Sequence, residues 1–188
     1  MGNPLTILVL SSCVATCIAC GGSTPTSPSS TAPPPPPKTV SLAFSSLTAD
    51  GASVTTHIES GFTVSVMSGD WSVRTTYGNP APFVQFWAQA GTTVGGEIRV
   101  TASGSTFSFK SVDLYSSTTP IPYTITGLRN SIRVFELSDT VPNTFGNFKT
   151  VVNQNASDVI DTLSITLTNP AAPCCRNPTG LDNIALVQ

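Results

Sequence analysis

The chain has 188 residues, with 8 Lys and Arg against 10 Asp and Glu, and charged residues make up only 10% of it. A nucleic-acid-binding protein needs a basic patch, so a formal net charge of −2 argues against nucleic acid as a partner. The roughly 150 residues that follow the first forty are enough for one domain with its own core.

The first 37 residues carry no charged side chain and begin with the mostly apolar run Leu5 to Ala19. This run is shorter than the roughly 20 residues that a membrane span needs, and it has the length of a signal-peptide core. Met1-Gly2-Asn3 with Thr6 also matches an N-myristoylation motif formally, but the apolar run that follows disfavours that interpretation.

Ile18-Ala19-Cys20-Gly21 resembles the end of a bacterial lipoprotein signal, in which a small residue precedes a lipidated cysteine. The resemblance implies a signal peptide over residues 1–19 and acylation, for example by palmitate, at Cys20. Cys17 stands where the pattern usually has Leu, Val or Ala, and Leu10-Ser11-Ser12-Cys13 offers a second match. Cys13 and then Cys17 are therefore the alternatives to Cys20, and a plain secretory signal is the alternative to lipidation.

The same resemblance implies a location: a bacterial cell envelope, with the chain exported and anchored in the membrane by lipid. Gly21 after the cysteine implies the outer membrane or cell surface. Residues 22–37, GSTPTSPSSTAPPPPP, have neither helix nor strand periodicity. Pro-rich chain favours extended polyproline II at about 3.1 Å per residue, so this segment could reach roughly 50 Å. We expect residues 20–38 to be a disordered tether.

From Lys38 onward the hydrophobic period is two, which predicts strands with one buried and one wet face. The clearest runs are Val40–Phe44, Phe62–Val66, Ile98–Thr101, Phe107–Phe109, Ile132–Leu137 and Leu163–Leu167. Turn-forming Gly, Asn, Asp and Pro separate them, and no segment has a helical period. Ten to eleven such strands predict that residues 39–188 form an all-β, antiparallel β-sandwich of the jelly-roll type.

Thr106–Tyr115, Tyr123–Leu128 and Gly180–Ile184 resemble the F-x-F-x-S-V-D-L … G-x-D-N-I pattern of exported bacterial galactose-binding-like jelly rolls. The resemblance implies that a structural Ca²⁺ could lie between the first and last strands, and no other cofactor. Calcium takes six to eight oxygens. Asp182 and Asn183 stand where a family aspartate would be, and Glu59 is a candidate partner. The alternative role of Asp182 is to cap the turn Asn177–Gly180.

The sequence has little that supports catalysis, so we expect that the protein is not an enzyme and has no catalytic residues. His57 is the one histidine, and no nucleophile elbow, zinc-protease motif or phosphate-binding loop is present. His57 is expected to be a strand residue near a sheet edge.

Aromatic residues in loops are the candidate ligand site, because carbohydrate modules stack sugars on exposed Trp or Tyr. Trp71 follows Gly69-Asp70, and Tyr77 lies beside Gly78-Asn79-Pro80. Trp71, Tyr77 and Asn79 could therefore form a sugar-binding rim, with ordinary packing and turn chemistry as the alternative. Trp87 is expected to be buried, because its strand is largely apolar on both faces.

Cys174 and Cys175 are adjacent, so a disulfide between them would close a strained ring. We favour this vicinal disulfide in an oxidising compartment. A bridge to another chain and a soft-metal pair are the alternatives.

These features predict a lipid-anchored, exported and non-catalytic module that binds carbohydrate or cell-envelope polysaccharide. The alternative is a structural or adhesive surface protein without a small ligand. A small glycan-acting hydrolase is the third hypothesis.

Overall fold

The computed structural model describes residues 36–76, 81–170 and 176–188. The predicted signal peptide, Cys20 and most of the tether lie outside the described residues, as do Tyr77, Asn79 and the pair Cys174 and Cys175. Every regular element in the described ranges is a β-strand. The described residues include no helix long and apolar enough to span a membrane.

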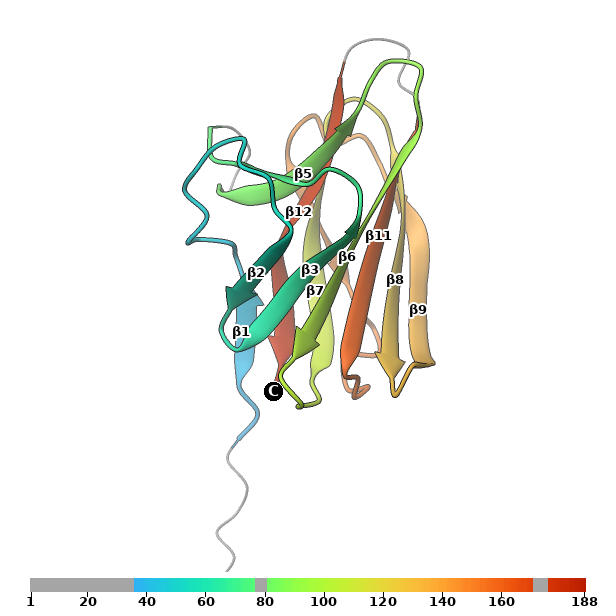
Figure 1. The fold of residues 1–188 in the computed structure, drawn as a ribbon. Helices are drawn as coiled ribbons and strands as arrows, with labels where there is room; N and C mark the ends of the chain where they lie inside the picture. The colour runs from blue at the N-terminus through green and yellow to red at the C-terminus, as the bar shows by residue number, and fades with distance from the viewer. Residues whose placement is uncertain (1–35, 77–80, 171–175) are drawn as a thin grey trace, which may run out of the picture. The chain divides into compact units, whose positions relative to one another are not determined.

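The strands form two antiparallel sheets of six strands each (Figure 1). The first sheet has the order β10 (Phe148–Val152), β7 (Ser108–Ser116), β12 (Asn177–Val187), β5 (Phe83–Ala88) and β4 (Ser72–Arg74), and β1 (Thr39–Leu42) also pairs with β12. The second sheet has the order β2 (Thr56–Glu59), β3 (Phe62–Ser68), β6 (Val94–Ala102), β11 (Thr162–Asn169), β8 (Ile121–Arg129) and β9 (Ile132–Val141). The predicted all-β antiparallel sandwich is confirmed.

The core lies between the two sheets and follows the alternation in the sequence. In β11, Leu163, Ile165 and Leu167 are fully buried, and the intervening Ser164 and Thr166 are half-buried on the other face. Each buried Leu, Ile or Phe contributes roughly 1.5–3 kcal/mol of transfer free energy. Removing apolar surface from water therefore drives the two inner faces together.

A β-bulge interrupts the alternation in β9, which is the edge strand of the second sheet. Gly127 of β8 pairs with Phe135, while Leu128 pairs with Arg133, so Val134 is the extra residue. Val134 is exposed, and the Phe135 ring is buried against Gly127, where an added Cβ would lie 2.2 Å from the ring. The glycine is needed because the aromatic ring occupies the place of a side chain.

The twelve strands of the described ranges exceed the ten to eleven predicted, because β2, β4 and β10 are short segments without a clear period of their own. His57 lies in β2, the strand at the other edge of the second sheet, which confirms the expectation for this residue. Its Nε2 lies 3.2 Å from Oε2 of Glu59.

β12 is the strand around which the first sheet is arranged. Its first half pairs with β5 and its second half with β1, while β7 runs along its other side. A register shift between Asp182 and Ala185 marks the change of partner, and Asn183 there has a φ of 48°. The first half of β12, together with β4, β5 and β7, presents the outer face on which the pocket described below lies.

Candidate functional site

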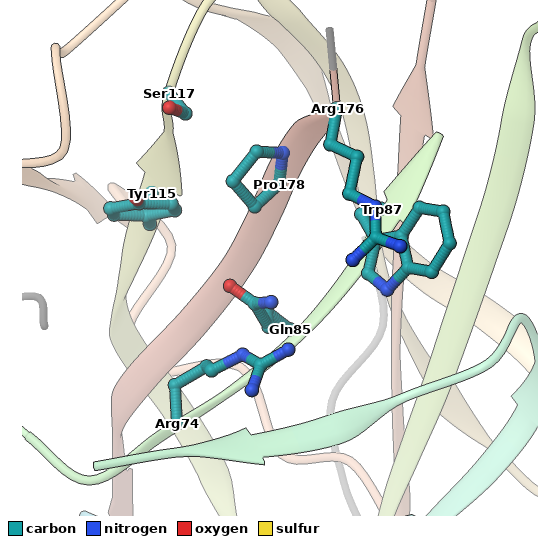
Figure 2. Close-up of a pocket in the computed structure, with 7 residues that line it drawn as sticks. All are labelled: Arg74, Gln85, Trp87, Tyr115, Ser117, Arg176 and Pro178. Carbon is teal, nitrogen blue, oxygen red and sulfur yellow. The ribbon is translucent and has the colours of Figure 1, made fainter. Parts of the chain in front are cut away.

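A pocket of about 570 Å³ lies on the outer face of the first sheet (Figure 2). Phe83, Gln85 and Trp87 of β5 point to this face, because they alternate with Val84 and Phe86 of the core. The described residues that line the pocket are Arg74, Gln85, Trp87, Tyr115, Ser117, Arg176 and Pro178. They come from β4, β5, β7 and β12 and from the segments at the ends of these strands.

The strand register places the lining residues in rows across the sheet. Gly180 of β12 pairs with Gln85 on one side and with Tyr115 on the other. A Cβ on Gly180 would lie 2.3 Å from the carbonyl oxygen of Val84, so no side chain fits there. Because Gly180 has no side chain, its backbone forms the floor of the pocket between Gln85 and Tyr115.

The next row along the strands pairs Trp87 with Pro178, and the N–H of Ser117 donates to the carbonyl oxygen of Pro178 at 3.2 Å. Trp87 is half-buried, so part of its surface faces the pocket. The backbone pairs of the rigid sheet hold these side chains in fixed relative positions. A site of this kind needs little reorganisation when a ligand binds.

Three aromatic rings on the outer face support one wall of the pocket. Phe83, Tyr115 and Phe148 contact one another with ring-centroid distances of 5.2 to 5.6 Å. Phe83 and Tyr115 are buried, although they lie outside the core cluster between the sheets. This second aromatic cluster fixes the orientation of the Tyr115 ring.

Two arginines lie at the pocket, and each is held by a different interaction. Figure 2 shows Arg74 and Arg176 reaching from opposite ends toward Gln85 and Trp87. The guanidinium carbon of Arg176 lies 4.1 Å from the centroid of the Trp87 ring, which is a cation–π contact. Nη1 of Arg74 lies 3.4 Å from Oδ2 of Asp50, and Oδ1 of this aspartate accepts the N–H of Thr75.

A second hollow of about 540 Å³ adjoins the pocket and shares Arg74, Trp87 and Arg176 with it. Its other described lining residues come from the segment 51–55, from Val66 and from the segment Gly69–Ser72. The three shared side chains therefore separate two neighbouring depressions on one surface. An extended ligand could contact both.

A loop with an exposed phenylalanine follows β9 near Tyr115. The side chain of Phe145 is 83% exposed, and its backbone N–H donates to Oδ1 of Asn143 at 2.9 Å. The N–H of Gly146 donates to the carbonyl oxygen of Ser116 at 3.2 Å, and a Cβ on this glycine would lie 3.7 Å from the Tyr115 ring. The loop is thus bonded to the end of β7, and its aromatic side chain is open to solvent.

The prediction that Trp71 forms an exposed sugar platform is wrong. Trp71 is only 2% exposed, its ring lies 4.8 Å from that of Phe86, and its Nε1–H donates to the carbonyl oxygen of Ser68 at 2.9 Å. The turn after Gly69 directs the indole into the core, where burial of its large apolar surface favours folding. Tyr77 and Asn79, predicted beside it, are outside the described residues.

The expectation that Trp87 is buried is also wrong, since its side chain is half-buried and lines both depressions. Sequence reasoning also missed Arg74, Gln85, Tyr115 and Arg176. One signal for the outer face was available: Gln85 is a polar residue between Phe83 and Trp87 in an otherwise apolar strand. An amide there indicates a face that is not packed against the other sheet.

Two of the predicted calcium residues, Asp182 and Asn183, lie at the change of partner in β12, and the third, Glu59, lies in β2; none of them lines the pocket. Asp182 is 1% exposed, and no hydrogen bond reaches its Oδ1 in the described part of the chain. Burial raises the pKa of Asp182 to about 7, and the carboxylates of Asp113 and Glu59 add to this, while a backbone hydrogen bond from Asn183 opposes it. A buried carboxyl of this kind favours a bound proton or a nearby cation.

The neighbouring carboxylates already accept other donors. Glu59 accepts the backbone N–H groups of Ala43 and Phe44 at 3.3 and 2.9 Å. Asp113 accepts the amide of Asn183 at 3.1 Å and the hydroxyl of Thr150 at 2.5 Å. Within the described ranges, no three His, Cys, Asp or Glu side chains are grouped as metal ligands. The structure thus brings Asp182 and Glu59 near each other, and calcium binding stays a prediction.

The fold of this chain is similar to that of several solved structures. No protein-family model matches the chain, and no curated protein matches its sequence. A DUF4465 family protein from Bacteroides caccae is similar in structure with a TM-score of 0.54 and 8% identity, over 80% of this chain and 99% of that one. At that identity, the similarity shows the fold alone.

Two carbohydrate-binding modules are also similar in structure, at lower scores. The family 29 module CBM29_1 from Piromyces equi has a TM-score of 0.47 and 11% identity, covering 81% of this chain and 91% of that one. The module TmCBM61, solved in complex with β-1,4-galactotriose, has a TM-score of 0.42 and 11% identity, covering 68% and 88%.

Proposed function

We propose that this protein is a carbohydrate-binding module whose ligand site is the pocket on the outer face of the first sheet. One observation carries the proposal: a half-buried tryptophan, Trp87, lies in a pocket beside the amide of Gln85 and the guanidinium of Arg74. Sugars present apolar C–H faces and a ring of hydroxyls. A flat ring with hydrogen-bonding side chains around it satisfies both.

The pocket has the size and support that a saccharide site needs. Its volume of about 570 Å³ is within the range of small-molecule sites. The floor is backbone at Gly180, and the walls rest on neighbouring strands. The adjoining hollow extends the same surface beyond Trp87, which supports an oligosaccharide rather than a single sugar as the ligand.

The proposed function is binding without catalysis. Glycoside hydrolysis uses two carboxylates on either side of the scissile bond. None of the described residues that line the pocket is acidic, and Asp70 is the one acidic residue among the described lining of the adjoining hollow. Asp182, whose raised pKa resembles that of a catalytic acid, is buried at another part of β12. Its burial separates it from a polymeric substrate.

Glycan-array screening of the wild-type protein, followed by calorimetric titration of the best ligand, tests the proposal. Trp87→Ala should weaken binding by roughly 10- to 100-fold, because a stacked aromatic platform contributes about 1–3 kcal/mol. The control is Ile132→Ala, an exposed residue at the far edge of the second sheet, which should leave affinity unchanged. If Trp87→Ala bound the ligand as tightly as the wild type, the pocket would not be the glycan site.

We further propose that the module is exported and lipid-anchored through Cys20, as the lipoprotein resemblance implies. The charge-free N-terminal region and its Pro-rich segment support this. In cells labelled with an alkynyl fatty acid, wild-type protein should incorporate label and Cys20→Ser should not. Label that persists in Cys20→Ser would place the acyl group elsewhere, with Cys13→Ser and Cys17→Ser as the next variants to examine.

Calcium is a separate proposal, supported by the Oδ1 of Asp182 that lacks a hydrogen bond. Asp182 and Glu59 would supply carboxylate oxygens, and backbone and amide oxygens would complete the shell. Millimolar calcium should then raise the unfolding temperature of the wild-type protein at neutral pH and leave that of Asp182→Asn unchanged. Equal unfolding temperatures with calcium and with chelator would exclude the site.

A further inference from the structure

The pocket is positively charged, which bears on the class of glycan that it would bind. Arg74 and Arg176 are among the described lining residues, and no described lining residue is acidic. The nearest balancing group, Asp50, approaches Arg74 at 3.4 Å from outside the lining and is itself held by the N–H of Thr75. A second carboxylate, Asp70, lines the adjoining hollow together with both arginines. The pocket itself thus has two guanidinium groups and no acidic residue among its described lining residues.

The guanidinium group of Arg74 makes few hydrogen bonds within the described part of the protein. Asp50 contacts Nη1, and Nε has no hydrogen-bond partner in the described part of the chain. Nε is buried, so a ligand in the pocket would contact the terminal nitrogens of the guanidinium rather than Nε. A planar anion is the acceptor that best matches the geometry of the planar guanidinium group.

Arg176 is presented in a fixed orientation. Its guanidinium lies 4.1 Å from the centroid of the Trp87 ring, although the residue is otherwise exposed. This stacking reduces the conformational entropy that the side chain would lose on binding. Arg176 also covers part of the Trp87 ring, so a sugar would contact the uncovered part of the indole beside the donors of the guanidinium.

The acidic residues of the same face lie one row further along the sheet. Asp182 of β12 pairs with Asp113 of β7, and Arg74 of β4 pairs with Phe83 of β5. Thr150 and Asn183 already donate to Asp113. The positive charge at the pocket is thus not neutralised from within the sheet.

We infer that the glycan is acidic and that a carboxylate- or sulfate-bearing sugar binds between Arg74 and Arg176, with its ring against Trp87. The inference rests on the proposed function and specifies its ligand. Charge-assisted hydrogen bonds are roughly twice as strong as neutral ones. An acidic oligosaccharide should therefore bind at least about tenfold more tightly than its neutral counterpart.

Calorimetric titration of the wild-type protein with matched ligand pairs tests this inference. Each pair has one backbone with and without its charge: tetragalacturonate and its methyl ester, a tetramannuronate and mannotetraose, and a sulfated and an unsulfated galactan oligomer. The uronate and sulfate arms distinguish the two sources of charge. Tighter binding of the acidic member of at least one pair, weakened by added salt, is the expected result.

The variants locate the effect. Arg176→Gln removes the charge and keeps a polar side chain, and it should weaken binding of the acidic ligand about tenfold while changing that of the neutral one by less than about threefold. Arg74→Gln should do the same, with thermal unfolding as the check that loss of the Asp50 contact leaves the fold intact. The matched control is Arg133→Gln, an exposed arginine of β9 that pairs with Glu136 at 2.7 Å.

The outcomes separate the inference from the function on which it rests. If acidic and neutral members bind equally, or Arg133→Gln has the effect of Arg176→Gln, the inference is overturned and glycan binding stands. If no glycan binds, the proposed function fails with it. An oligoglutamate peptide that binds as tightly as the best acidic sugar would show that the pocket recognises anions generally, and would overturn the assignment to a glycan.

Discussion

Trp71 and Trp87 lie in opposite environments at the scale of single residues. Trp71 is buried against Phe86 with its indole N–H bonded to a carbonyl, whereas Trp87 is half-buried under Arg176. Alternation cannot distinguish them, because one is outside a strand and the other has apolar neighbours on both faces. Only the path of the chain after Gly69 turns Trp71 inward, and no local pattern encodes that path.

Replacing the two tryptophans should destabilise the protein to different extents. Trp71→Ala should lower the free energy of unfolding by about 3–5 kcal/mol, as expected when a large aromatic side chain leaves a core. Trp87→Ala should lower it by about 1 kcal/mol, which is the scale of a lost cation–π contact and partial burial. Urea unfolding followed by circular dichroism measures both. A larger loss for Trp87 would contradict the assignment of Trp71 to the core.

Asp182 gives the protein a specific dependence on pH. Its folded-state pKa, raised to about 7, lies above the ordinary aspartate value, so protonation favours the folded state. This contribution to stability is complete below about pH 4 and is lost as the pH rises to about 7. In that window, one extra proton bound by the folded chain changes stability by up to about 1.4 kcal/mol per pH unit.

Asp182→Asn should remove this component. Unfolding free energies of the two proteins, measured in chelator across the same pH window, should converge at the acid end. The variant should become relatively more stable toward neutral pH, because its buried amide carries no charge. Parallel pH profiles would show that Asp182 is not protonated in the folded protein at neutral pH.

At the scale of elements, β12 depends on a glycine at the pocket floor. A Cβ at Gly180 would lie 2.3 Å from the carbonyl oxygen of Val84, which is backbone in a paired strand and cannot move cheaply. Gly180→Ala should therefore destabilise the protein by at least about 2 kcal/mol. Gly95→Ala is the matched control in β6, since nothing lies within 4 Å of its added Cβ.

Thermal unfolding measures the difference between the two glycine variants. Gly95→Ala should stay within about 0.5 kcal/mol of the wild type, because the new methyl group meets open space. Equal stability of the two variants would contradict the close approach of β5 and β12 at Gly180. That approach is what positions Gln85 and Tyr115 on either side of the pocket floor.

The strands also show how far an element can be predicted from sequence. Period-two alternation located most of β11 and β3 and the second half of β6, because their inner faces are continuous and apolar. In β9 the alternation changes phase between Val134 and Phe135, and the structure has a bulge there. A phase change of this kind is a local signal, so the bulge could have been predicted. β4, at three residues, is too short to show any period.

At the scale of the whole molecule, the fold followed from the sequence and the site did not. Two antiparallel sheets follow from many alternating strands, because each needs a partner for its apolar face. The pocket is built from the consecutive strands β4 and β5 and from β7 and β12, which lie further along the chain and meet them through the pairing of one sheet. Arg74 and Arg176 are about a hundred residues apart, and nothing local links them.

The central claim is that glycan binds at Trp87, and the two indole N–H groups of the protein test it directly. In a ¹⁵N-correlated NMR spectrum, assigned with Trp71→Phe and Trp87→Phe, a bound oligosaccharide should shift the Trp87 indole resonance. The Trp71 indole is buried and bonded to Ser68, so its resonance should move much less. A ligand that binds without shifting the Trp87 signal, or that shifts Trp71 more, would contradict the account.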